Sequence, residues 1–284
     1  MIKMFFLISL WSVFSSISSN AYEMKIASVP GYSKVWLMVM ADRVSVDQIR
    51  NIRMHLHGWT QDRNTGAPVN PLFDFEWKNP STPPTQSGLK KFVESFGIQN
   101  EVEKNHDRAV LIPISRGHCD QYPELLNGFD RTFSAVLGSF GLPEDQVKLV
   151  HVSAHSGGGE VLSRLLVDST SRFFTHVKHV TFYDAIYSAG TQNRLMTWIL
   201  AKKEGLIKSL DLPVITGGSP WVRASDLFDQ LSSVESTEFK TVGGYQLKFR
   251  AKVLSSFNFV HVVTESKKAP TLDHWTIVKT LWEL

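Results

Sequence analysis

The sequence contains a single cysteine, Cys119, among 284 residues. One cysteine cannot form an intramolecular disulfide, so the stability of the protein must come from its packed core, which a chain of this length can supply. Cys119 lies in a segment Arg-Gly-His-Cys-Asp that follows a predicted strand and has no helix start behind it. This context favours an inert thiol over a catalytic one.

The sequence also has little net charge and no block of Lys or Arg: its formal net charge is +3, and 20% of its residues are charged. This balance argues against a nucleic-acid partner. The ten histidines include no His-Glu-x-x-His motif, and His55 and His57 form only a pair without a nearby third ligand. The Gly-rich stretch after Ser156 lacks the Gly-Lys-Ser/Thr ending of a phosphate-binding loop. We therefore expect no metal ion and no cofactor.

Long apolar runs are missing from the chain except at its beginning. Lys3 precedes an apolar run from Met4 to Ile17, and Ser19-Asn20-Ala21 has the small residues of a cleavage site. The run is shorter than the ~20 residues that span a membrane. We therefore expect residues 1–21 to be a secretory signal peptide and 22–284 to be one domain. The product is expected to be secreted or periplasmic, with no stable membrane span after cleavage.

The rest of the chain is organised around the stretch from Val147 to Glu160. A short run rich in Val and Leu predicts a buried strand, and a helical pattern beginning at Val161 follows it directly. Between them lies Ser156, with Ala154 two positions before it and Gly158 two positions after it. Small residues at these positions allow strand and helix to approach closely, and the Ser is expected at φ > 0 in a strained turn. This pattern predicts a nucleophile elbow, in which the Gly157 N–H faces developing negative charge.

Strands and helices alternate along the chain, which predicts an α/β protein with a mostly parallel sheet and helices on both faces. Besides the elbow strand and its helix, the patterns predict strands at 25–28, 34–40, 53–56, 109–114, 179–183, 212–216 and 257–263, and helices at 89–99, 129–140, 194–203, 221–231 and 277–284. Binding sites in such sheets form at the carboxyl ends of strands. His57, Ser156, Asp184 and His274 each follow a predicted strand or lie in the loop after one.

This arrangement resembles the α/β-hydrolase superfamily, in particular exported, serine esterase-like or lipase-like members of bacterial type. The resemblance covers nearly the whole chain after the leader and uses the order Ser, Asp, His. It implies an α/β-hydrolase fold with little or no cap domain. It also implies Ser156 as nucleophile and His274, which lies between the last strand and the last helix, as general base and acid. The oxyanion hole would combine Gly157 with the loop that contains Gly58 and Trp59.

The triad acid remains open between two residues. Asp184 directly follows the strand at 179–183, and some members of the superfamily use this position; Asp226, in a predicted helix, is the reserve. The alternative role for Asp184 is a helix cap or a turn former. Asp273 is adjacent to His274 in sequence, which makes the required side-chain geometry awkward, and we discount it.

The pocket is expected to include His57, His155 and Tyr187, whereas His55, which lies on the predicted strand itself, is expected to be a core histidine. The long loop from residue 60 to 88 contains the aromatic residues Phe73, Phe75 and Trp77, which favour packing over a cleft. The expected activity is hydrolysis of carboxylic esters, with a small-molecule or polymeric acyl substrate. A peptidase or amidase on the same scaffold, or a non-catalytic binding protein, is the alternative. The sequence leaves the oligomeric state open.

Overall fold

The computed structural model describes residues 21–29, 35–58, 84–114, 122–168, 170–186, 188–201, 204–211, 229–231, 233, 235–242, 244–254, 256–264, 278 and 282. Its strands are β1 (Tyr22–Ser28), β2 (Val35–Ala41), β3 (Asn51–Leu56), β4 (Arg108–Ile114), β5 (Lys148–His155), β6 (His179–Tyr183), β7 (Glu204–Asp211), β8 (Glu235–Val242), β9 (Tyr245–Leu254) and β10 (Ser256–Thr264). Its helices are α1 (Gln86–Phe96), α2 (Ile98–Lys104), α3 (Pro123–Leu126), α4 (Phe129–Phe140), α5 (Gly158–Asp168) and α6 (Ala189–Ala201), with 3-10 turns at Val46–Gln48 and Arg172–His176.

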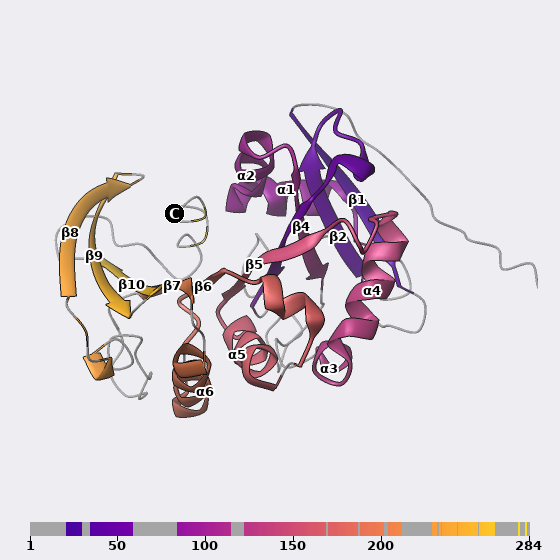
Figure 1. The fold of residues 1–284 in the computed structure, drawn as a ribbon. Helices are drawn as coiled ribbons and strands as arrows, with labels where there is room; N and C mark the ends of the chain where they lie inside the picture. The colour runs from indigo at the N-terminus through magenta and orange to yellow at the C-terminus, as the bar shows by residue number, and fades with distance from the viewer. Residues whose placement is uncertain are drawn as a thin grey trace, which may run out of the picture.

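The strands form one ten-stranded sheet in the order β1-β2-β4-β3-β5-β6-β7-β10-β9-β8. The central strands β4, β3, β5, β6, β7 and β10 pair in parallel, whereas β1 and β2 at one end and β9 and β8 at the other pair antiparallel. Figure 1 shows the β8–β9 hairpin at the end of the sheet opposite β1. The predicted α/β fold with a mostly parallel central sheet is therefore confirmed.

Helices cover both faces of the central strands (Figure 1). On one face, α4, α5 and α6 pack their apolar side chains into a core with alternate residues of the strands, among them Met54 and Phe182. On the other face, α1 and α2 pack together with Val278 and Trp282 near the C-terminus. Because successive strand residues point to opposite faces, each central strand contributes to both cores. Among the described residues, no helix has the length and apolarity needed to cross a membrane.

Several predicted elements are confirmed, and others need correction. The helix at 129–140 and the strand at 179–183 have the predicted bounds. The predicted helix 89–99 is instead two helices, because Gly97 adopts a left-handed φ of 70° and ends α1. The helix expected from Arg194 begins earlier, at Ala189, because the Ser188 hydroxyl accepts the Thr191 N–H at 3.0 Å. Strands β7, β8 and β9 were not predicted, and the strand expected at 212–216 lies outside the described residues, as do the leader up to residue 20 and most of the last helix.

Candidate active site

Ser156 occupies the turn between the parallel strand β5 and helix α5. Its φ of 52° is the left-handed conformation expected for a nucleophile elbow, which non-glycine residues rarely adopt. The Ser156 N–H donates to the Tyr183 carbonyl at 3.1 Å, and the Ser156 carbonyl accepts from the Gly159 N–H at 3.0 Å. These bonds hold the strained turn against the end of β6. Ser156 is 9% exposed, so the turn is closely surrounded by the rest of the protein.

Three glycines around the turn allow this close packing. A Cβ at Gly58 would overlap Ser156 Cβ and lie 3.0 Å from its hydroxyl oxygen. A Cβ at Gly158 would overlap the Leu56 carbonyl, and one at Gly159 would overlap the Ala185 carbonyl. The segments after β3 and β6 are therefore in backbone contact with the elbow. Of the two small residues that define the sequence motif, Gly158 is therefore required by a close backbone contact.

Asp184 directly follows β6 and, like Ser156, has a left-handed backbone, with φ of 42°. Its side chain is half-buried. Since the neighbouring Tyr183 carbonyl accepts from the Ser156 N–H, Asp184 lies next to the elbow in the fold. The N-terminus of α6 is capped by Ser188, which argues against the helix-cap role considered for Asp184. A strained backbone held in place by its surroundings is common at functional sites.

The start of α6 is joined to the elbow helix α5 through Glu160. The Glu160 carboxylate accepts from the Thr191 hydroxyl at 2.6 Å and pairs with Arg194 at 2.6 Å and Arg164 at 3.1 Å. Burial raises the pKa of Glu160, but the Thr191 hydroxyl and the two guanidinium groups outweigh burial and hold that pKa below its ordinary value. The ionised carboxylate therefore joins α5 to the start of α6.

The strands that lead into the site, β3, β5 and β6, carry a set of polar side chains on the sheet face that α1 and α2 cover. The residues of this set lie in rows across β3, β5 and β6. One row contains Arg53, His151 and His179, and the next contains His55, Ser153 and Thr181. His155 pairs with Tyr183, and His57 directly follows β3. Ser153 accepts from Arg53 at 3.2 Å and contacts His55 Nδ1 at 2.9 Å. Sequence reasoning missed this polar face, although polar residues at alternate positions in three consecutive strands were a signal for it.

Arg53 is the centre of this polar face and is 2% exposed. Its guanidinium donates to Glu101 Oε2 at 2.6 Å and to the Tyr183 hydroxyl at 2.8 Å, and lies 3.6 Å from the ring centroid of Trp282. Burial lowers the pKa of Arg53, but Glu101 and Tyr183 raise it above its ordinary value. Burial raises the pKa of the Tyr183 hydroxyl. Arg53 thus connects the strand that precedes Asp184 with α2 and the C-terminal region.

The predicted pocket histidines His57 and His155 lie in the core beside the elbow. His57 is 1% exposed; its Nδ1 lies 2.8 Å from the Gly58 carbonyl and its Nε2 lies 3.4 Å from the Tyr122 hydroxyl. His155 is fully buried, with its ring centroid 6.4 Å from that of Phe96. The structure therefore brings Ser156, Gly157, Gly58, His57, His155 and Asp184 together.

The other predicted site residues, Trp59, Tyr187, Asp226 and His274, lie outside the described residues. The structure adds one carboxylate that sequence reasoning missed. Asp211 is the last residue of β7, the strand next to β6 in the sheet, so its backbone is at the same edge as Ser156 and Asp184. Strand β7 was not predicted from the sequence, and Asp211 was therefore not among the candidate acids.

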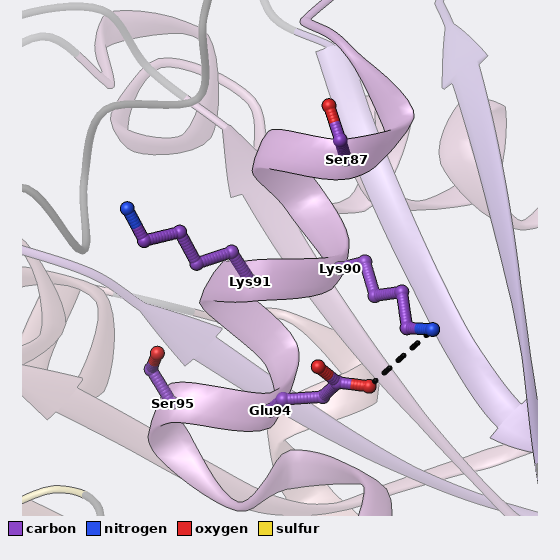
Figure 2. Close-up of a pocket in the computed structure, with 5 residues that line it drawn as sticks. All are labelled: Ser87, Lys90, Lys91, Glu94 and Ser95. Atoms are coloured by element: carbon purple, nitrogen blue, oxygen red, sulfur yellow. Dashed lines mark ion pairs between the residues drawn. The ribbon is translucent and has the colours of Figure 1, made fainter.

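A surface hollow of about 350 Å³ lies along α1, away from these residues. Figure 2 shows its lining side chains, all from this helix, with the Lys90 ammonium directed at the Glu94 carboxylate 3.7 Å away. None of the candidate site residues lines it. Within the described part of the chain, no three His, Cys, Asp or Glu side chains are arranged to hold a metal ion.

No known protein family matches the sequence, and no curated protein matches it. Among solved structures, the chain is similar to an S-formylglutathione hydrolase from Agrobacterium tumefaciens, with a TM-score of 0.48 and 9% identity over 94% of each chain. It is also similar to a cold-adapted esterase from an Arctic intertidal metagenomic library, with a TM-score of 0.45 and 8% identity over 90% of each chain.

A third similar structure is an uncharacterised protein from Capnocytophaga ochracea, with a TM-score of 0.48 and 9% identity; the match covers 91% of this chain and 62% of that protein. This chain therefore spans less than two thirds of the length of that protein. Similarity at these identities concerns the arrangement of the chain alone, and neither activity nor substrate follows from it.

Proposed function

We propose that the protein is a serine hydrolase that cleaves carboxylic esters, with Ser156 as the nucleophile. The observation that supports this most is the left-handed φ of Ser156 at the junction of a parallel strand and a helix N-terminus, with Gly58 packed against its side chain. A backbone held in this costly conformation presents the hydroxyl at the carboxyl edge of the sheet. A turn needed only for folding could use a glycine and avoid the strain.

In the proposed reaction, Ser156 Oγ attacks the carbonyl carbon of the ester while His274 accepts the hydroxyl proton. The carbonyl oxygen becomes negative and accepts hydrogen bonds from the backbone N–H groups of Gly157 and Trp59. The bond to the alcohol oxygen then breaks, and His274 returns the proton to the leaving alcohol. Water next attacks the acyl group by the same route, releasing the acid and restoring the Ser156 hydroxyl.

Asp184 is our choice for the acid that orients His274, because its backbone is adjacent to the elbow through Tyr183. A carboxylate in this role keeps the imidazole in the correct tautomer and stabilises its charged form. Asp226 remains the reserve, and Asp211 becomes a third choice because it ends the neighbouring strand β7. We further propose that the protein acts outside the cytoplasm, as the predicted leader requires.

A fluorophosphonate probe tests the mechanism directly, because it forms a stable bond only with an activated serine. We expect the wild-type protein to be labelled, and labelling to be abolished in Ser156→Ala and His274→Ala. Asp184→Asn, Asp211→Asn and Asp226→Asn form a matched set of isosteric changes, and the variant with the largest loss of labelling rate identifies the acid. Loss of the acid should slow acylation about 10⁴-fold, as in other triads.

Ser153→Ala is the control for the serine variant, because Ser153 lies on β5, the strand that leads into the Ser156 turn, but its side chain belongs to the buried polar face. A probe that labels wild-type and Ser156→Ala protein equally would contradict the assignment of the nucleophile. Folded wild-type protein that takes up no probe would instead favour a non-catalytic binding protein. Comparing turnover of an ester and an amide with the same acyl group separates an esterase from an amidase.

A further inference from the structure

The two edge strands of the sheet differ in how much of them is covered. β1 lies at one edge, where α4 and α2 pack against it, and its residues are mostly half-buried. β8 lies at the other edge, and all of its residues up to Thr241 are exposed. Since β-strand residues alternate between faces, both faces of β8 are open to solvent. Phe239, in the middle of β8, is 57% exposed.

The pairing of β8 with β9 determines which backbone groups of β8 are left at the free edge. Two residues separate Val242 from its partner Tyr245, and the residues that flank a two-residue hairpin loop exchange both hydrogen bonds. Alternate residues from Val242 backwards therefore bond to β9. The N–H and C=O groups of Thr237, Phe239 and Thr241 point outward, where no described strand pairs with them.

We propose that β8 is a homodimer interface, in which β8 of a second copy pairs antiparallel with it about a two-fold axis through Phe239. In this register Phe239 faces its own counterpart, and Thr237 faces Thr241 of the second copy. Thr237, Phe239 and Thr241 then all form hydrogen-bonded pairs, about six backbone hydrogen bonds in total. The two sheets would join into one continuous sheet, and neither β8 edge would remain open.

The charges on β8 favour this register. Glu238 and Lys240 lie on one face of the strand, 3.0 Å apart, with side chains 64% and 48% exposed. A two-fold axis through Phe239 puts Glu238 opposite Lys240 of the second copy, twice in each dimer. An axis through Glu238 or Lys240 would instead bring like charges face to face, which is unfavourable. Charged residues on an edge strand usually prevent pairing with arbitrary strands, and here their order favours the symmetric register that sets unlike charges opposite each other.

Sedimentation equilibrium of the purified protein over a concentration series tests the proposal. We expect a monomer–dimer equilibrium that weakens as salt is added, because the cross-strand ion pairs are exposed and screened. Lys240→Glu and Glu238→Lys each turn two attractive pairs into repulsive ones, so each should raise the dimer dissociation constant about tenfold or more. The double variant Glu238→Lys/Lys240→Glu restores unlike pairs and should restore the dimer.

Lys25→Glu is the matched control, because Lys25 pairs with Glu23 two positions away on the opposite edge strand, β1. This variant should leave the dimer unchanged. Circular dichroism of each variant confirms that the chain is folded, and the double variant distinguishes a lost interface from a damaged hairpin. A wild-type protein that stays monomeric throughout the series would overturn the proposal. Three other results would also overturn it: a dimer that persists in both single variants, a double variant that does not dimerise, or a Lys25→Glu variant in which the dimer dissociates.

Discussion

The two faces of the central strands are both buried but are built from different chemistry. One face of β3, β5 and β6 contributes Met54, Leu56, Val152, Ala154, Val180 and Phe182, all fully buried and apolar. The residues between them, on the other face, include Arg53, His55, Ser153, Thr181 and Tyr183, which are also almost completely buried. The same three strands therefore have one apolar face and one hydrogen-bonded polar face.

The difference shows how the sheet tolerates buried charge. Burying an ion is costly unless it is paired and its remaining donors are satisfied. Arg53 meets both conditions through Glu101, Tyr183 and Ser153. The apolar face needs only shape complementarity, whereas the polar face depends on every partner being present. We therefore expect the two faces to respond differently to substitution.

The largest effect is expected for Glu101→Ala on the polar face. Glu101 is 7% exposed and its carboxylate pairs with both Arg53 at 2.6 Å and Arg108 at 2.8 Å. Removing it leaves the buried Arg53 charge uncompensated, which should lower the free energy of unfolding by about 3–5 kcal/mol. Urea denaturation measures this loss. Glu103→Ala, a half-buried residue on the same helix, is the control and should change stability by about 0.5 kcal/mol or less.

The apolar face should respond through cavity formation. Met54→Ala removes a fully buried side chain from the core beneath α5 and should cost about 3 kcal/mol. Unlike the loss from Glu101→Ala, this loss should be independent of salt and nearly independent of pH, because no charge is exposed or orphaned. Denaturation at two ionic strengths checks the distinction. A Met54→Ala penalty that varies with salt as much as the Glu101→Ala penalty would contradict the contrast between the faces.

A double substitution should turn the polar face partly into an apolar one. In Arg53→Met/Glu101→Leu no uncompensated charge stays buried, since Arg108 is partly exposed and can reach solvent. We expect this variant to lose only about 1–2 kcal/mol, mainly from the Tyr183 hydroxyl, which loses its bond from Arg53, whereas Ser153 keeps its contact with His55. It should therefore be more stable than Glu101→Ala alone. Equal or greater loss in the double variant would show that the ion pair itself, rather than its desolvation, dominates.

The sequence predicted the apolar face better than the polar one. The helix from Phe129 to Phe140 and the strand from His179 to Tyr183 have strong apolar periodicity and clear ends, and both were located correctly. The elbow at Ser156 was predicted because small residues on both sides of a Ser have a steric cause that local sequence displays.

Long-range pairing explains what the sequence did not predict. The contacts of Arg53 with residues 48 and 130 positions away follow from strand order, which local patterns do not specify. Strand β8 was missed because an exposed strand with polar or charged residues at most positions lacks the alternation of a half-buried sheet. Strand β9 does alternate apolar and polar residues from Tyr245 to Val253, so a signal for it was present in the sequence. Strand β7 was missed because the more apolar segment after it was preferred, and Asp211 was overlooked with it.

The smallest effect expected is the pH dependence caused by His55. Burial lowers the pKa of His55 well below its usual value, and the nearby Arg53, His155 and His57 lower it further. The unfolded chain takes up a proton as the pH falls below about 6.5, but the folded protein does not, so stability is lost as the pH falls below that value. One such group contributes a slope of at most about 1.4 kcal/mol per pH unit.

In His55→Asn, whose side-chain amide can keep the bond to Ser153, this slope should decrease between pH 6.5 and 5. Urea denaturation at several pH values measures it, and Met54→Ala should retain the wild-type slope. An unchanged slope in His55→Asn would mean that other histidines of the polar face carry the dependence.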